Sequence, residues 1–241
     1  MLIKTKAIVL TSLKYGDADL IVKCLTEEGV KSYLLRSIFR TKSKKLKTGY
    51  FQPLSQLDIT AVHNNKGNLN KITEVRVSYL YQTLATDIYK QSIALFLAEV
   101  LSYALKEEEQ NTVQFQYIEN SLKWLDHHHA FANFHLLFLL QLTKFLGFYP
   151  DVTYMDALFF DLEEGCFCAS KPTRHFLSNQ KLILFKSLIG IKFDHMEGLK
   201  WNSENRQVVL DILLEYYELH LPGFKKPRSL KVLKEVFNEI S

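Results

Sequence analysis

Two different hydrophobic periods divide the chain near residue 78. Before it, short apolar and β-branched runs alternate with turn residues, a pattern that predicts strands. Turn chemistry stands at Tyr15-Gly16-Asp17 and at Glu27-Glu28-Gly29. The expected strands cover residues 4–13, 19–26, 30–37, 56–62 and 69–77. Five short strands at this spacing are typical of a small closed barrel, and the oligonucleotide/oligosaccharide-binding (OB) barrel is the commonest of that size.

After residue 78 the apolar period becomes helical, with steps of three and four residues along 84–105. Further helices are expected at 111–125, 130–146, 179–188, 203–219 and 229–240. Gly147 should close one of them, and Asn202 or Ser203 should cap the start of another. Residues 158–169 break the helical pattern and predict a β-hairpin that turns at Glu163-Glu164-Gly165.

These patterns together predict an α+β protein. An N-terminal five-stranded OB-type β-barrel, a nucleic-acid-binding domain, should occupy residues 1–78. An α-helical domain should occupy residues 79–241, interrupted by a small β-hairpin insertion at about 151–175.

The composition is that of an ordinary globular protein, with 47% hydrophobic and 23% charged residues among 241. The N-terminus lacks the order of a signal peptide, and the most apolar stretch, residues 131–142, is too short to span a bilayer. Three cysteines do not suggest a set of disulfides. We therefore expect a cytoplasmic protein, associated with the nucleoid if it binds DNA, and no membrane partner.

Charge is concentrated in the first third of the chain. Residues 1–78 carry 14 Lys and Arg against 6 Asp and Glu, whereas the remainder carries 16 against 20. Residues 31–47 hold no acid at all. Their cations are Lys31, Arg36, Arg40, Lys42, Lys44, Lys45 and Lys47, and two aromatic residues, Tyr33 and Phe39, are interleaved with them. Such a run is either a solvated basic loop or a track for nucleic-acid phosphates, and the charge asymmetry favours the second.

The two aromatic residues in the basic run also have two possible roles. Tyr33 and Phe39 could stack on bases, or they could fill the core of their own strand, as large apolar side chains usually do. A second basic cluster lies near the end of the chain, without an acid between Leu221 and Lys234. Its candidates for binding DNA or an acidic peptide tail are Lys225, Lys226, Arg228 and Lys231.

Sequence signals for catalysis or a cofactor are absent. The nine glycines form no phosphate-binding loop, and neither a G-x-S-x-G nor an H-E-x-x-H motif occurs. Cys166-x-Cys168 could be half of a zinc site, but structural zinc usually takes four ligands and the second half is missing. Three consecutive residues, His127–His129, cannot converge on one ion from a helix. We expect neither enzymatic activity nor a cofactor, with zinc in particular not expected.

Several short segments resemble the bacterial recombination-mediator family RecO, in the family's order. They include Ala7-Ile8-Val9-Leu10, Tyr15-Gly16-Asp17-Ala18-Asp19, Phe51-Gln52-Pro53-Leu54, Leu146-Gly147-Phe148-Tyr149-Pro150 and Lys226-Pro227-Arg228-Ser229-Leu230. The resemblance implies an OB barrel and a helical domain with a small insertion that often binds zinc. Where many members carry two Cys pairs, this chain has Val152, Tyr154 and only Cys166-x-Cys168. Packing, through Phe159, Phe160 and Phe167, would then have to hold the insertion.

The same resemblance implies a non-enzymatic function in recombinational repair by the RecF pathway. RecO-like proteins bind single- and double-stranded DNA, anneal complementary strands, and partner RecR and the C-terminal tail of single-stranded-DNA-binding protein (SSB). They help load RecA onto SSB-coated DNA. Two alternatives stay open: an RNA-binding OB module, and a scaffold whose basic loop meets an acidic protein partner.

Overall fold

The computed structural model describes residues 1–40, 47–64, 69–107 and 110–238 of the chain. The chain divides into two compact units. The first comprises Met1–His127 together with Pro227–Ser229, and the second comprises His128–Lys226 together with the chain from Leu230 on. The predicted domain ranges, which meet at residue 78, follow the change of hydrophobic period and stay a prediction.

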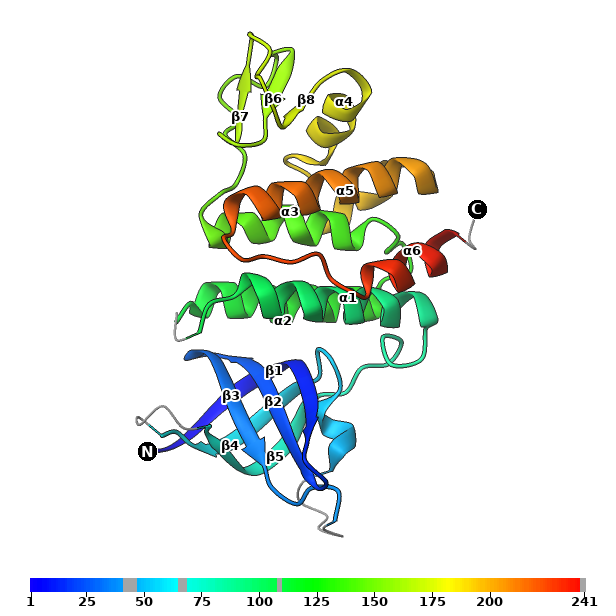
Figure 1. Cartoon of the computed structure of the whole chain (residues 1–241). Helices are drawn as coiled ribbons and strands as arrows, with labels where there is room; N and C mark the ends of the chain where they lie inside the picture. The colour runs from blue at the N-terminus through cyan, green and yellow to red at the C-terminus, as the bar shows by residue number, and fades with distance from the viewer. Residues whose placement is uncertain (41–46, 65–68, 108–109, 239–241) are drawn as a thin grey trace. The chain divides into compact units, whose positions relative to one another are not determined.

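Five antiparallel strands build the barrel of the first unit (Figure 1). They are β1 (Leu2–Tyr15), β2 (Asp19–Thr26), β3 (Gly29–Leu35), β4 (Gln56–Val62) and β5 (Lys71–Tyr79), in the order β3-β2-β1-β4-β5. Hydrogen bonds at the start of β5 join the two outer strands: Leu34 N donates to Asn70 O over 2.8 Å, and Asn70 N donates to Ser32 O over 3.0 Å. The predicted five-stranded OB-type barrel is confirmed.

The period-two pattern of the sequence builds the barrel core. Residues at alternating positions of each strand point inward, and Val9, Val22, Tyr33, Leu57 and Ile59 are all nearly inaccessible to solvent. The pairing of β1 with β2 changes register at a bulge between Val9 and Thr11. The bulge bends this long strand around the barrel.

Two helices belong to the same unit as the barrel, α1 (Ile88–Ala104) and α2 (Thr112–His127). Asp87 caps α1, because its side chain accepts hydrogen bonds from the backbone N–H groups of Tyr89 and Lys90. Near the end of α2, the buried carboxylate of Asp126 accepts from the backbone of residues 82–84, the segment that leaves the barrel. This contact fastens the connection between the barrel and its helices.

The second unit is helical and carries a small sheet at one end (Figure 1). Its helices are α3 (Phe134–Leu146), α4 (Asn179–Leu188), α5 (Ser203–His220) and α6 (Leu230–Asn238). Gly147 ends α3 in the left-handed region, with φ of 84°, and Asn202 caps α5 by accepting from Asn205 N. The strands β6 (Phe159–Asp161) and β7 (Cys166–Cys168) form the predicted hairpin, and β8 (Phe176–Leu177) adds a third strand beside β6. The predicted α+β class is thus confirmed.

Aromatic packing holds this small sheet against α4 and α5. The ring of Phe160 lies 4.8 Å from that of Phe167, 4.9 Å from that of Phe185 and 6.0 Å from that of Tyr216, measured between centroids. Phe159, the third aromatic residue expected to hold the insertion, instead lies edge-on to Phe176. Within the described ranges, no helix is long and apolar enough to cross a membrane.

Candidate nucleic-acid interface

Residues 36–40 of the basic run follow β3 directly, and hydrogen bonds fasten them to the turn between β1 and β2. Ser37 N donates to Asp19 Oδ1 over 2.7 Å, and Phe39 N donates to Ala18 O over 3.1 Å. Ser37 takes a left-handed conformation with φ of 55°, which turns the chain back toward the β1–β2 turn. Phe39 and Arg40 are therefore held at this end of the barrel by their own backbone.

The side chains at this end combine cations with an exposed ring. Phe39 is 47% exposed, and Lys14 Nζ lies 5.7 Å from its ring centroid. The guanidinium of Arg40 lies 3.6 Å from the carboxylate of Asp17, and both side chains are largely exposed. An exposed ion pair of this kind contributes little to stability. A phosphate could replace the Asp17 carboxylate beside Arg40 without disturbing the fold.

The other cations of the basic run are placed differently or lie outside the described residues. Lys31 is half-buried on β3, opposite Cys24 on β2, and so is less accessible than expected. Arg36 is exposed directly after β3, and Lys47 is exposed directly before the short 3₁₀-helix Thr48–Phe51. The remaining three, Lys42, Lys44 and Lys45, lie outside the described residues.

The structure corrects the prediction that Tyr33 could stack on a base. Tyr33 lies opposite Val22 on the inward side of β3, its exposure is 0%, and its hydroxyl is 3.0 Å from His63 Nε2. Burial raises the pKa of Tyr33 and lowers that of His63. Tyr33 is a core residue, the other role that the sequence allowed.

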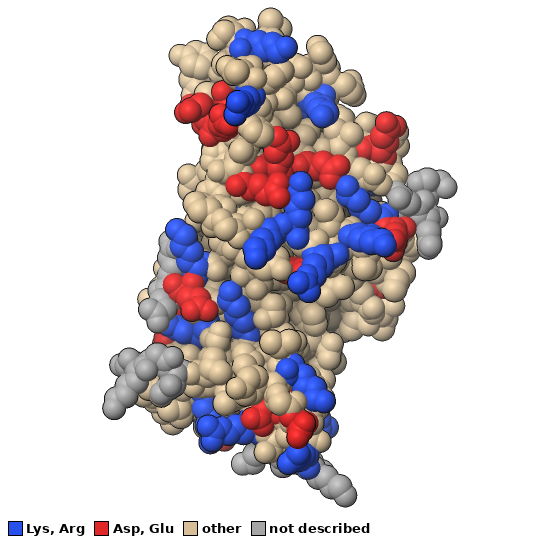
Figure 2. All heavy atoms as spheres, in the orientation of Figure 1, with Lys and Arg blue, Asp and Glu red and all other residues tan. Residues whose placement is uncertain are grey.

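Acids accompany the C-terminal cations. Figure 2 shows basic and acidic side chains intermixed on the face of the helical unit in view. Lys226 Nζ lies 3.2 Å from Glu218 on α5, and Lys231 Nζ lies 3.8 Å from Glu235 one helical turn further on. Lys225 is exposed. Because part of their charge is balanced at the surface, Lys226 and Lys231 attract an anion less strongly than the sequence run suggested.

Arg228 belongs to the first unit, with the short segment Pro227–Ser229. The backbone N–H and the hydroxyl of Ser229 both donate to Glu99 Oε2 on α1, over 2.9 and 2.5 Å. Burial alone would raise the pKa of Glu99, but these hydrogen bonds and the nearby Arg228 hold it below its ordinary value. The segment is thus fixed to α1, and the side chain of Arg228 stays exposed.

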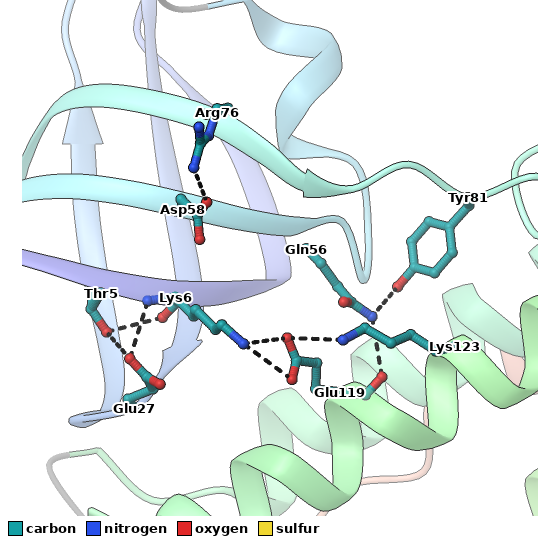
Figure 3. Close-up of polar contacts among 9 residues, drawn as sticks. All are labelled: Thr5, Lys6, Glu27, Gln56, Asp58, Arg76, Tyr81, Glu119 and Lys123. Atoms are coloured by element: carbon teal, nitrogen blue, oxygen red, sulfur yellow. Dashed lines mark hydrogen bonds and ion pairs between the residues drawn. The ribbon is translucent and has the colours of Figure 1, made fainter.

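A large hollow lies on the outward side of β1, β4 and β5, with a volume of about 720 Å³. Its charged lining residues are the cations Lys4, Lys6 and Arg76 and the acids Glu27, Asp58 and Glu74. Two of the cations are paired: Lys6 with Glu119 at 3.1 Å, and Arg76 with Asp58 at 2.8 Å (Figure 3). Three cations and three acids line the hollow, so its charges balance. It should therefore bind phosphates less well than the end of the barrel near Arg40.

The two cysteines of the insertion do not make a zinc site with the described residues. Cys166 and Cys168 are free thiols on one side of β7, and burial raises the pKa of both. In the part of the chain that the structure describes, no three His, Cys, Asp or Glu residues are grouped to hold a metal ion. The donors present do not fit a four-ligand site.

A closed OB-type barrel joined to a helical region with a small sheet insertion defines the class of this protein. Two family models match the chain in succession: "Recombination protein O N terminal" over residues 1–81 and "Recombination protein O C terminal" over residues 85–230. The chain therefore belongs to the RecO family of DNA repair proteins.

Curated relatives cover the chain from end to end. The proteins called DNA repair protein RecO in Flavobacterium johnsoniae and Flavobacterium psychrophilum are each 46% identical to it over 239 residues, which is 99% of this chain and 100% of each relative. The protein of the same name in Bacteroides fragilis is 36% identical over 242 residues, again with 99% and 100% coverage. The resemblance seen in the sequence is confirmed.

Proposed function

We propose that this protein is a non-enzymatic, DNA-binding recombination mediator of the RecF pathway. Family membership carries this proposal, and the end of the barrel near Arg40 supports it. There, Lys14 Nζ lies 5.7 Å from the ring centroid of the exposed Phe39, and Arg36 and Arg40, close by in the sequence, are exposed. Cations bind the phosphates of a strand, and an exposed ring can stack on its bases. The proposed mediator binds single- and double-stranded DNA and anneals complementary strands.

The proposed protein partners are RecR and the C-terminal tail of SSB, with RecA reached indirectly by loading onto SSB-coated DNA. A hollow in the helical unit supports the SSB tail in particular. Arg206 and Lys234 lie there beside the apolar side chains of Leu210, Leu233 and Phe237, and Lys234 is also paired with Asp211 over 2.8 Å. An acidic peptide that ends in a hydrophobic residue needs this combination of charges and apolar surface. Lys225, Lys226, Arg228 and Lys231 are proposed as further contacts to the tail or to DNA.

The test is binding of the full chain to a labelled single-stranded oligonucleotide across a salt series. Wild type is compared with a variant in which Arg40, Lys42, Lys44 and Lys45 are changed to Ala. If these cations bind phosphates, affinity falls with salt, and the log–log slope of the variant flattens by about 0.7 for each phosphate that the variant no longer neutralises.

A matched control removes one arginine and three lysines from the exposed surface of the second unit, Arg174, Lys181, Lys192 and Lys200. Its slope should equal that of wild type. Equal slopes for all three proteins would refute the assignment of phosphates to the barrel. Tighter binding of an RNA of the same sequence would favour the RNA-binding alternative, and weak binding of both nucleic acids would favour the scaffold alternative.

A further inference from the structure

Three large apolar side chains are exposed around one contact between the insertion and α4, in the second unit (Figure 1). Tyr154 and Leu158, on the loop before β6, are 71% and 70% exposed, and Ile183 on α4 is 61% exposed. The ammonium of Lys186, one helical turn after Ile183, donates to the carbonyl of Ala157 over 2.9 Å. Ala157 lies directly before Leu158, and its backbone N–H donates to Tyr154 O over 3.0 Å. The three apolar side chains form a loop–helix face, and exposed apolar residues gathered in this way mark an interaction surface.

The charges of this region are divided by sign between two consecutive segments of the chain. Residues 151–164, which contain the loop and end at the hairpin turn, hold five acids and no Lys or Arg. Residues 165–193, which contain β7, β8 and α4, hold five Lys or Arg and no Asp or Glu. All of these residues are described, and within them no ion pair joins an acid to one of the five cations; Glu163 pairs instead with His175, at 3.9 Å. The two sets of opposite charge therefore lie in one region without neutralising each other directly.

One acid and one cation stand at the loop–helix face itself. Asp156 lies on the loop between Tyr154 and Leu158 and is exposed. Lys186 is half-buried, and its ammonium is bound to the neutral carbonyl of Ala157. Neither charged side chain forms an ion pair with another residue that the structure describes. The face thus has an apolar centre, an acid on its loop side and a cation on its helix side, and each charge can accept a partner group of opposite sign.

We propose that the loop–helix face binds the same face of a second copy of the chain and forms a two-fold symmetric dimer. In such a contact the loop of each copy lies against the helix of the other, so Asp156 of one copy meets Lys186 of the second. The side chains of Tyr154, Leu158 and Ile183 of both copies form the apolar centre. This inference goes beyond the proposed DNA binding and does not depend on it, because the face lies in the second unit and contains no barrel residue.

The mixture of charges argues for a second copy as the occupant. Nucleic acid or an acidic peptide would be attracted by Lys186 but repelled by Asp156 and the other acids of residues 151–164. A copy of the same face, turned about a two-fold axis, supplies a cation to the loop, an acid to the helix and apolar side chains to the centre. Because an isologous contact forms each pair twice, exposed ion pairs that are weak singly together fix the orientation of the two copies.

The experiment is sedimentation velocity of the full chain at concentrations from about 1 to about 100 μM. Wild type should pass from monomer to dimer within this range. Asp156→Lys should weaken the dimer at least about tenfold, because it replaces two attractive pairs with two repulsive ones. Lys186→Glu should weaken it to a similar degree. An equimolar mixture of the two variants should dimerise again, since the two changes restore opposite charges at both pairs.

Ile183→Gln tests the apolar centre, and Val113→Gln is its matched control. Val113 on α2 is 65% exposed, close to the 61% of Ile183, but lies outside the loop–helix face. Ile183→Gln should weaken the dimer at least about tenfold, because this side chain is buried twice in the contact, whereas Val113→Gln should leave the dimer unchanged. Circular dichroism that matches wild type shows that each variant is folded.

A wild type that stays monomeric up to about 100 μM would overturn the proposal. So would a dimer that Asp156→Lys and Ile183→Gln leave intact, because the contact would then lie elsewhere. If both charge variants are monomeric and their mixture also stays monomeric, the pairing of loop with helix is wrong. Each variant should bind a single-stranded oligonucleotide as wild type does, with the same salt dependence, so loss of the dimer and loss of DNA binding are measured separately.

Discussion

Replacing Asp126 should destabilise the first unit more than any surface change of similar size. Its carboxylate is fully buried and accepts hydrogen bonds from the backbone N–H groups of Gln82, Thr83 and Leu84, at 2.8 to 3.1 Å, and from the hydroxyl of Tyr79 at 3.0 Å. Burial alone would raise the pKa of Asp126, but these hydrogen bonds outweigh it and hold the pKa below its ordinary value. One side chain thus accepts the hydrogen bonds of three successive backbone N–H groups in the turn that leads out of the barrel.

The magnitude follows from what each substitution leaves unsatisfied. Asp126→Ala leaves three backbone donors without an acceptor, and each such donor costs about 1–3 kcal/mol where water cannot reach it. Because Gln82 is exposed and Thr83 is only partly buried, the expected loss is about 3–5 kcal/mol in the free energy of unfolding. Asp126→Asn keeps one carbonyl oxygen as an acceptor for the backbone, but it loses the charge and replaces the second acceptor oxygen by an NH2 donor, so it should cost about 1–2 kcal/mol.

The pH dependence has a definite sign. A carboxyl group whose pKa is lower in the folded state stabilises the fold fully above its unfolded pKa, about 3.9, and this contribution is lost as pH falls through the folded pKa. Wild type should therefore lose part of its advantage over Asp126→Asn when the pH is lowered from about 7 to below about 4. The difference should be constant between about pH 6 and 8.

The measurement is urea unfolding followed by tryptophan fluorescence in a Trp201→Phe background. Trp124 on α2 is then the single tryptophan of the chain, and it lies within one helical turn of Asp126. A loss below about 1 kcal/mol for Asp126→Ala would refute the reasoning. So would a gap between wild type and Asp126→Asn that does not narrow on acidification.

Three further changes test other parts of the structure. A Cβ at Gly165 would lie 2.6 Å from the hydroxyl oxygen of Tyr216, and the φ of Gly165 is +69°. Gly165→Ala should therefore lower the free energy of unfolding by about 2–4 kcal/mol. In a Tyr216→Phe background the loss should be about 1–2 kcal/mol smaller, which a double-mutant cycle of unfolding measures. Asp17→Asn frees Arg40 from its ion pair, so the affinity for a single strand at low salt should rise. The rise should be at most about fivefold, because exposed ion pairs are weak. An unchanged affinity would show that Arg40 makes no phosphate contact. EDTA should leave the melting temperature unchanged, because aromatic packing holds the insertion, and a fall on chelation would reveal a metal.

The sequence predicts the fold well because the determining patterns are local. The barrel strands alternate with period two, and their turns carry Gly16 and Gly29, which take positive φ in the structure. The position of Gly147 after an apolar helical run likewise predicts the end of α3. What the pattern cannot show is packing between distant segments. The hydrogen bonds of Asp126 to residues 82–84 join parts of the chain more than 40 residues apart, so the attachment of α1 and α2 to the barrel is not visible in the sequence.

The candidate site is only partly predictable for the same reason. The basic run places the candidate site at one end of the barrel, but it cannot show that Tyr33 is buried while Phe39 is exposed. Because Gly16 follows it, Tyr15 reads in the sequence as part of a turn. The structure continues β1 through Tyr15, so Leu13 and Tyr15 share one side of the strand. In the sequence, residues 11–15 continue the period-two alternation of the strand. This alternation is the signal that β1 extends into the turn.

Adjacency in the sequence also misleads at the other end of the chain. Lys226 and Arg228 are two residues apart, yet they belong to different compact units. Ser229, which follows Arg228, fixes its segment to Glu99 on α1. A substitution that removes both charges therefore perturbs two units at once. Single changes are needed: Lys226→Ala removes an ion pair with Glu218 inside the helical unit, whereas Arg228→Ala removes an exposed charge from the unit that holds the barrel. If DNA binds the first unit, only the second change should alter the salt dependence of binding.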